Sequence, residues 1–575
     1  MRSAVKAAFR KVMKVPSRLG RLRERMLTAA NSRNDFLAYC ATIRPYRKLI
    51  ATMPPADQGG LLIVSGRGMN VVWAQVWTLL SLCGRANRLK PYVLTTRTQE
   101  HLNRYFRLLD IELLYLDDLV DRVDTPLPSD FLSRLEAAQN FEDFRALVLD
   151  RVPIGDIALS TYCRYHGTGL VDTRQQSVRD SVRQWIEQVW RAMVVSGDIF
   201  ARYDIRATYH TEVFMEEYGG IYYAALNAGI KVIRFAGTVR DDAYIVQHRT
   251  WEDDRLHHAA LAHSSWESVR VLPEWDRIRT ELEQNFADRY GDKWHRSKRN
   301  HPASMINDPV TARAELGVPD GRKVAVVYSH ILYDTIFFFG TDLFKDYATW
   351  LIETVREAVS NDKLEWFIKV HPSNIWRGEM TSMLGGRYEE ERLIEAYIGT
   401  LPPHVHIVQA NSHISPLAWM QLADFGITVR GTSGLEMAAL GRTVITAGTG
   451  RYEGRGFTYD PQTQDAYRDL LHRLPDIPQI TPEQTELAQR YAHGIFILKP
   501  FKLSTLEPRL RTGRKEVVAS DDLVYVPRPL HANTLPDDLR ELADFLLDDC
   551  RVDLLSDASY IAEKPMLRSV KHAVS

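Results

Sequence analysis

At 575 residues the chain is too long for a single hydrophobic core, so its length predicts two or three domains. Lys plus Arg and Asp plus Glu both number 73, and this balance excludes a protein dedicated to nucleic acid, which needs a basic excess. The hydrophobic and charged fractions, 45% and 25%, are those of ordinary globular proteins rather than disordered or fibrous ones.

The cysteines are few and far apart. Cys40, Cys83, Cys163 and Cys550 form no CxxC pair, so neither a disulfide framework nor a zinc site is predicted. The N-terminus lacks the apolar stretch and cleavage site of a secretory signal, and no apolar run reaches membrane-spanning length. We therefore expect a cytoplasmic protein that uses no metal.

The first segment, residues 1–26 of an expected unit 1–30, is strongly basic, with nine Lys and Arg against the single acid Glu24. Val5, Phe9 and Val12 recur at the spacing of one helical face. A cationic amphipathic helix is attracted to anionic headgroups, which favours peripheral contact with the inner face of a plasma membrane. A solvated terminal helix is the alternative, because Pro16 limits the helix.

From Gly60 onward, short buried strands alternate with helical segments, which predicts parallel sheets covered by helices. We expect an α/β protein with two Rossmann-like, doubly wound domains facing a cleft. The expected domains are 31–300 and 301–481, followed by a helical C-terminal extension, 482–575. The expected strands are 60–65, 91–96, 111–116, 206–213, 231–235 and 243–247 in the first domain, and 323–328, 365–370, 404–408, 424–429 and 443–447 in the second.

The stretch from Asp424 to Pro461 is the most informative. A buried strand is followed by Arg430, a tight Gly-Thr-Ser-Gly turn and a helix that begins LEMAAL. Helix N-termini at the carboxyl ends of parallel strands bind phosphate. Thr432 and Ser433 add hydroxyl donors, Gly434 admits close approach, and Glu436 can accept bonds from ribose hydroxyls. The alternative is a capping box in which Thr432 or Ser433 caps the helix and Glu436 caps back.

The preceding strand ends in Lys369 and His371, at the same edge of the sheet. Pro372 keeps the backbone at His371 extended or in a turn, which directs the imidazole away from the strand end. A histidine there can donate to a phosphate oxygen of a leaving nucleotide, although a lone strand-end His-Pro pair is a weak signal.

Two further loops follow strands of this domain. Ser329, His330 and Asp334 come after its first strand, and a glycine-rich loop runs from Gly448 past Thr458 to Asp460. This second loop either closes over a donor sugar or is a flexible hairpin. All four loops are expected at one edge of the sheet, where they predict a single site.

These residues resemble a known family. KVHPSN, RGTSGLEMAALGRTVITAGTG with the following FTYD, and SHILYDT together look like the capsule polysaccharide biosynthesis family of glycosyltransferases, whose fold is GT-B. The resemblance covers roughly residues 200–460. It implies that His371 contacts the donor phosphate, that Thr432 and Ser433 lie beside it, and that Glu436 contacts the ribose. In the family, serines are commoner at the positions of Thr432 and Gly434.

A base for the acceptor hydroxyl is sought in the first domain, after the strand 206–213. Glu212 is chosen because it is nearest the carboxyl end of that strand, with Glu216, Glu217 and His210 as further candidates. The alternative for each acid is a helix cap or a surface carboxylate.

The loop SGRGMN carries Gly66, Arg67 and Gly68 between a strand and a helix and is a candidate site for acceptor or phosphate. A plain tight turn is the alternative, because the third glycine of a dinucleotide fingerprint is absent.

The sequence thus predicts a metal-independent glycosyltransferase without a cofactor, whose partners are a nucleotide sugar and a glycan. CMP-Kdo is one candidate donor, and the acceptor is a capsule or other surface polysaccharide or a lipid-linked glycan. The alternatives are a CDP-glycerol-type glycerophosphotransferase and a non-catalytic glycan-binding assembly protein.

Overall fold

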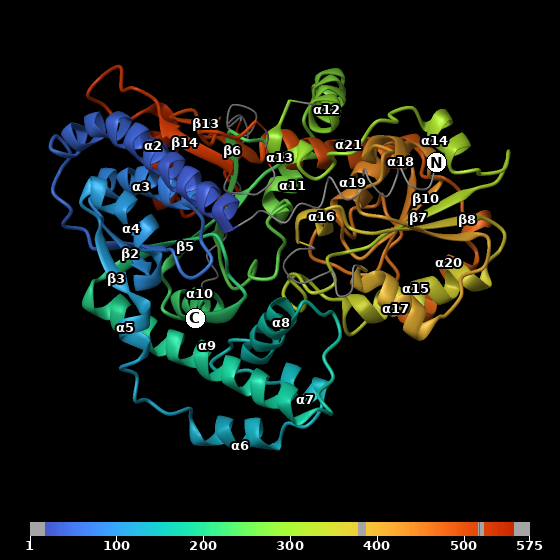
Figure 1. Ribbon diagram of the computed structural model, residues 1–575, viewed down its shortest axis with the longest axis horizontal. Helices are drawn as coiled ribbons and strands as arrows, with labels where there is room; N and C mark the ends of the chain where they lie inside the picture. Colours follow the sequence, from blue (N-terminus) through green and yellow to red (C-terminus); the bar gives the residue numbers. More distant parts are fainter. Residues whose placement is uncertain (1–17, 292, 378–386, 516, 518–521, 557–575) are drawn as a thin grey trace, which may run out of the picture.

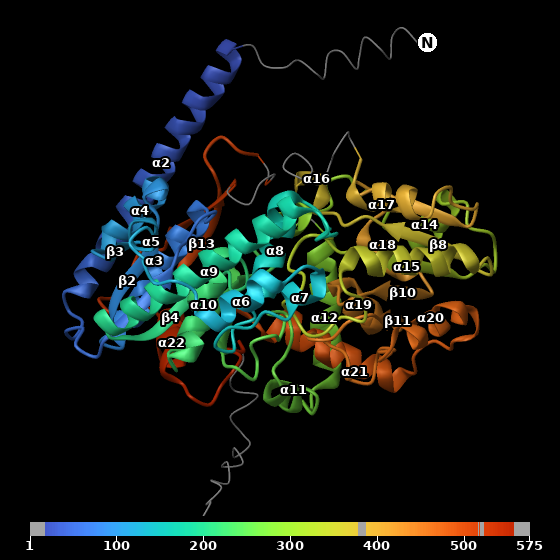
Figure 2. The ribbon, with the colours of Figure 1, turned by 90° about the horizontal axis from the view of Figure 1, so that it is seen from below.

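The computed structural model describes residues 18–291, 293–377, 387–515, 517 and 522–556 (Figure 1). Two sheets, of seven and five strands, form the centres of two domains that lie side by side. Most of the predicted membrane-contacting segment, residues 1–17, lies outside the described residues, so membrane contact stays a prediction. Helix α2 (Arg18–Ile50) begins after it, and Figure 2 shows its first turns projecting beyond the first domain.

The sheet of the first domain has the order β12-β6-β5-β4-β1-β2-β3. Strands β1 to β5 are parallel, as expected, but β6 runs antiparallel to β5. The connection from Gly237 to Ala243 is too short for a crossover helix, so the chain turns back as a hairpin. The strands are β1 (Gly60–Val64), β2 (Lys90–Thr95), β3 (Glu112–Tyr115), β4 (Ile205–His210), β5 (Lys231–Gly237), β6 (Ala243–Arg249) and β12 (Pro500–Lys502).

Helices cover both faces of this sheet. Leu61 and Ile63 of β1 pack in one core with α3 and α22, while Leu62 and Val64 pack in the other with α8, α9 and α10. Because both faces are buried, the strand is apolar throughout rather than alternating. The helices are α3 (Val71–Ala86), α8 (Ile154–His166), α9 (Gln176–Arg202), α10 (Glu216–Asn227) and α22 (Asp537–Leu547).

The sheet of the second domain is wholly parallel, in the order β11-β10-β7-β8-β9. Helices α15, α17 and α20 lie on one face and α14, α18, α19 and α21 on the other. The strands are β7 (Val324–Tyr328), β8 (Glu365–Lys369), β9 (Val405–Val408), β10 (Phe425–Thr428) and β11 (Thr443–Thr446). The helices are α14 (Pro309–Glu315), α15 (Tyr347–Ser360), α17 (Glu389–Tyr397), α18 (Pro416–Leu422), α19 (Thr432–Ala439), α20 (Gln464–His472) and α21 (Pro482–His493).

Each sheet reverses its strand order at one point, between β1 and β4 in the first domain and between β7 and β10 in the second. The loops at the carboxyl ends of such a pair diverge and leave a crevice, which is where open α/β sheets bind ligands. The topology therefore puts the loop Gly66–Gly68 beside Glu212, and the loop after Tyr328 beside the turn after Thr428.

The C-terminal extension contains strands as well as helices. Helix α21 packs on α19 and α12 (Trp275–Tyr290), after which β12 joins the edge of the first sheet antiparallel to β6. Strands β13 (Leu506–Leu510) and β14 (Leu523–Pro527) form a hairpin against α2 and α3. The sequence predicted a helical extension here and missed these short strands, because they depend on partners far away in the sequence.

A buried ion pair fixes the extension to the first domain. Lys499 and Asp553 are both fully buried, with Nζ and Oδ1 2.7 Å apart, and Asp553 also accepts a hydrogen bond of 2.8 Å from Gln247 of β6.

Among the described residues, none of the helices combines the length and the apolar character that a membrane span requires.

Replacing Lys499 by Met should lower the free energy of unfolding by roughly 3–5 kcal/mol, because the Asp553 carboxylate stays buried without its partner. Urea denaturation measures the loss. Lys502→Met, at the exposed end of the adjoining strand β12, is the control and should change stability by less than about 0.5 kcal/mol. Equal stability of the two variants would contradict this role for the ion pair.

Candidate functional site

A cavity of about 400 Å³ lies where the carboxyl ends of β7, β8 and β10 face the first half of the chain. It is the crevice expected from the reversal of strand order between β7 and β10. The residues predicted from sequence that line it are Ser329, His330, Asp334, Lys369, His371, Arg430, Thr432, Ser433 and Glu436. His371 and Ser433, from different loops, therefore share one cavity.

His330 is held as a neutral ring by the turn after β10. Its Nε2 accepts from the backbone N–H of Arg430 at 3.3 Å and lies 3.2 Å from the Thr428 hydroxyl. Burial and the charge of Arg430 lower the pKa of His330 well below its usual value. With Nε2 accepting, the ring proton is assigned to Nδ1. His330 thus links two of the loops that form the cavity.

The loop that carries His371 is anchored by the buried carboxylate of Glu390 on α17. That carboxylate accepts from the Ser329 hydroxyl at 3.0 Å and from the Asn374 side-chain amide at 3.2 Å. The Ser373 N–H donates to His371 Nδ1 at 3.2 Å, which leaves the proton of the neutral ring on Nε2. Ser329, predicted to bind donor, has its hydroxyl engaged in holding this loop.

Two buried cations on the cavity wall have no carboxylate partner among the residues that the structure describes. Lys369 is 5% exposed, and burial lowers the pKa of its ammonium to about 8. Arg451 is 9% exposed and donates to the Arg430 carbonyl and the Thr432 hydroxyl at 3.0 and 2.6 Å. Burial lowers the pKa of Arg451 as well. The cavity therefore favours an anion.

Glu436 is fixed on the same wall. Its Oε1 lies 2.9 Å from Arg289 Nε and accepts from the Tyr290 hydroxyl at 2.6 Å. The N-cap of α19 is Gly431, with no side-chain capping bond, so the capping box considered as the alternative is not formed. Glu436 instead joins α19 to the end of α12.

Arg430 was predicted to bind phosphate, but its terminal nitrogens are engaged elsewhere. They donate to the Phe339 carbonyl and form an ion pair with Asp342. At Gly448 a Cβ atom would come within 2.6 Å of both charged groups, so glycine is required for the ion pair rather than for ligand contact. Thr458 donates to Asp460 at 2.7 Å, and neither Gly448 nor Thr458 lines the cavity.

The first domain brings its predicted residues to the crevice between β1 and β4. Burial raises the pKa of the Glu212 carboxyl, although the charges of Arg234 and Arg164 act to lower it. Arg164 also forms an ion pair with Asp334 of the cavity wall. Glu212 itself does not line the cavity. Burial lowers the pKa of His210 to about 3, which argues against it as a base at neutral pH.

The loop Gly66–Gly68 is fixed by packing. A Cβ at Gly66 would come within 2.8 Å of the Tyr218 ring, whose hydroxyl donates to the Arg67 carbonyl at 2.6 Å. The Arg67 side chain is exposed and lies 3.6 Å from Glu217. Burial and Glu217 raise the pKa of the Glu216 carboxyl to about 7. This loop and these acids lie outside the cavity, on the first domain's side.

Several lining residues were missed by the sequence analysis. They come from segments that appear as ordinary helices or loops and reach the cavity only through the tertiary fold. Arg451 lies within the glycine-rich loop and shows that this loop contributes a cation. The others are His257, His258, Arg289, Tyr290 and His301. In the described part of the chain, no group of three or more His, Cys, Asp and Glu is placed to hold a metal ion.

Neither protein families nor curated proteins give a match to the chain. Solved structures with a similar arrangement include the KpsC β-Kdo 2,4 transferase of Thermosulfurimonas dismutans, at 14% identity, a TM-score of 0.28, and 50% of this chain against 79% of that one. The β-Kdo 2,7 transferase of the same protein has 15% identity and a TM-score of 0.29, and the match covers 54% of this chain and 83% of that one. A UDP-GlcNAc 2-epimerase of Neisseria meningitidis bound to UDP-GlcNAc has 13% identity and a TM-score of 0.25, and the match covers 76% of this chain and 96% of that one. The fold assignment rests on the strand orders given above.

Gly434 was predicted to admit a ligand, but its neighbour is Tyr452, whose hydroxyl donates to the Gly431 carbonyl at 2.8 Å. A Cβ at Gly434 would come within 2.2 Å of that hydroxyl oxygen. Gly434→Ala should therefore destabilise the protein by about 1–3 kcal/mol through overpacking.

The same substitution in a Tyr452→Phe background should cost less by about 0.5 kcal/mol or more, because the clashing oxygen is gone. Thermal or urea unfolding of the wild type, both single variants and the double variant measures this coupling. Strictly additive losses would show that Tyr452 is not what requires a glycine at position 434.

Proposed function

We propose that this chain is a metal-independent glycosyltransferase of the GT-B type, which binds the phosphate of a nucleotide-activated sugar in the cavity between its two domains. The acceptor is a capsule or other surface polysaccharide or a lipid-linked glycan, and CMP-Kdo is one candidate donor. The proposal joins the motif resemblance to the chemistry of the cavity.

The observation that carries the proposal is the pair of buried cations, Lys369 and Arg451, that form no ion pair with a carboxylate in the described part of the chain. A buried charge without a partner costs several kcal/mol, and a bound anion offsets that cost. The amide N–H groups at the start of α19 and the hydroxyl of Ser433 are donors of the kind that phosphate oxygens accept. A nucleotide mono- or diphosphate supplies the matching charge.

In the proposed reaction the acceptor oxygen attacks the anomeric carbon as the bond to the phosphate oxygen breaks. Negative charge develops on the leaving phosphate, where Lys369, Arg451 and the Nε2–H of His371 stabilise it. Glu436, held by Arg289 and Tyr290, accepts bonds from the ribose hydroxyls. Glu212, whose carboxyl pKa is raised by burial, removes the acceptor proton from the first domain's side of the crevice.

Nucleotide affinity should fall between pH 7 and pH 9. Burial lowers the pKa of Lys369 to about 8, so the ammonium is charged at pH 7 and mostly neutral at pH 9, and binding at the higher pH requires proton uptake. The expected rise in Kd is up to about tenfold. A thermal-shift screen with CMP, CDP and UDP selects the nucleotide, and calorimetry at both pH values gives the Kd.

Lys369→Arg is the matched variant, because a guanidinium stays charged at pH 9. Its Kd should change less across this range than that of the wild type. Lys369→Met and His371→Ala should each weaken binding at pH 7 by tenfold or more. If none of the three nucleotides binds the wild-type protein, the assignment of this cavity fails.

Glu212→Gln should leave nucleotide affinity within about twofold and lower the rate of nucleotide release from activated sugars by about 10²–10⁴-fold, because the base is lost. Asp334→Asn is the comparison, since it removes the cavity carboxylate that pairs with Arg164. A fully active Glu212→Gln with an inactive Asp334→Asn would transfer the role of base to Asp334.

A further inference from the structure

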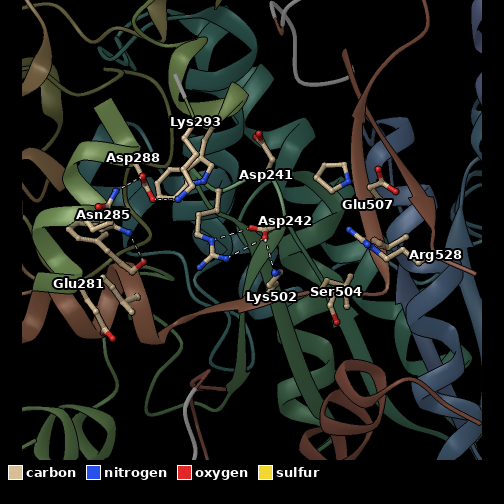
Figure 3. A pocket seen from close by; sticks show the side chains of 18 of the residues that line it. Asp241, Asp242, Glu281, Asn285, Asp288, Lys293, Lys502, Ser504, Glu507 and Arg528 are labelled. Carbon is tan, nitrogen blue, oxygen red and sulfur yellow. Dashed lines mark hydrogen bonds and ion pairs between the residues drawn. The ribbon is translucent and has the colours of Figure 1, made fainter. Parts of the chain in front are cut away.

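A much larger cavity, of about 1200 Å³, opens on the surface beside the first one (Figure 3). Helix α12 forms one wall with Glu281, Asn285 and Asp288, and the C-terminal extension forms the other with residues 502–504, 506–508 and Arg528. The β5–β6 connection, residues 240–242, lies between them. We name this cavity the α12 groove. It lies at the carboxyl end of β5, the ligand edge of the first sheet.

A third cavity, of about 490 Å³, lies between the α12 groove and the cation-lined cavity. Arg240 and Phe496 line both the groove and this intermediate space. Arg289, Thr432 and Arg451 line both the intermediate space and the cation-lined cavity. The three spaces thus follow one another and share walls, from the α12 groove to the cation-lined cavity.

The charges of the groove nearly cancel. Arg240 pairs with Asp242 at 3.1 Å, and Lys293 pairs with Asp288. Cations and acids therefore neutralise one another within the walls, so the groove lacks the basic excess that attracts a polyanion. The charged lining residues are Arg240, Lys293, Lys502 and Arg528 against Asp241, Asp242, Glu281, Asp288 and Glu507.

The side-chain amide of Asn285, on α12, is only partly satisfied by hydrogen bonds within the described residues. Asn285 is 9% exposed, and its amide nitrogen donates to the Phe496 carbonyl at 3.3 Å, while its buried Oδ1 has no hydrogen-bond partner among the described residues. Buried polar atoms are satisfied in the great majority of cases, so this buried oxygen behind the groove wall indicates a donor, such as a water molecule, beyond the protein's own groups. Trp294 adds an aromatic surface to the same wall.

We propose that the α12 groove binds a neutral stretch of the acceptor glycan, whose growing end passes through the intermediate cavity to the donor site. Sugar hydroxyls both donate and accept hydrogen bonds, which matches walls of mixed carboxylate, amide, guanidinium and hydroxyl groups around an aromatic ring. This inference rests on the proposed glycosyltransferase function and adds the chemistry and the path of the acceptor.

The test uses the full-length protein on an array of defined glycans: neutral oligomers of glucose, galactose, mannose and N-acetylglucosamine, with hyaluronan and heparin as polyanions. Gln284→Trp and Ser504→Trp fill the groove from its two walls, and both positions are exposed, so the fold should tolerate them. Ser133→Trp, exposed on α6 (Ser129–Ala137) and outside the groove, is the matched control.

We expect the wild type and Ser133→Trp to retain a neutral oligomer, and both groove variants to lose at least tenfold in affinity for it. Retention of polyanions alone, retention of no glycan, or equal retention by all four proteins would overturn the inference. Nucleotide affinity is measured on the same proteins and should be unchanged in every variant. If the wild-type protein binds no nucleotide, the proposed function itself is contradicted, whatever the array shows.

Discussion

The parallel arrangement of strands is the constraint on which the rest of the structure depends. Because β7, β8 and β10 run in the same direction, their following loops emerge at one edge of the sheet. The reversal of strand order then opens a crevice between two of these loops. Hydrogen bonding across the crevice, from the turn after β10 to His330, sets how closely the loops approach. Every group assigned to the donor is positioned by that edge.

The burial of charge follows from the same geometry. Lys369 is the last residue of a central strand and cannot reach bulk water, so its ammonium occupies the cavity wall. Arg430 is next to a strand end as well, but the loop after β7 supplies Asp342, and the two charges cancel. Arg430 is therefore neutralised by an ion pair, whereas the charge of Lys369 is left for a ligand. This difference depends on contacts from loops far away in the sequence.

The sequence predicted every strand of the two sheets except β12, because the other strands are short apolar runs bounded by turn residues, and most of them are buried on both faces. It also predicted that Lys369, His371, Thr432, Ser433 and Glu436 meet, since strand ends of a parallel sheet are neighbours by construction. It could not reveal that Gly434 and Gly448 are required by Tyr452 and by an ion pair, because those neighbours come from other loops. Arg289 and His301 were missed for the same reason: they belong to a polar connection without strand or motif, and packing alone brings them to the cavity.

The return of the C-terminal extension has a consequence for synthesis of the chain. The edge of the first sheet is completed by β12, and α3 packs against β14 and α22, which also come late in the chain. Domains generally fold in order as the ribosome releases them. Here the first domain keeps an unpaired strand edge and an apolar helix face until the chain has been synthesised to about residue 547. By contrast, every strand of the second domain's sheet has been synthesised by residue 446. The second domain can therefore fold first, and the first domain, although earlier in the sequence, is completed last, with a long interval in which its exposed edge is open to aggregation.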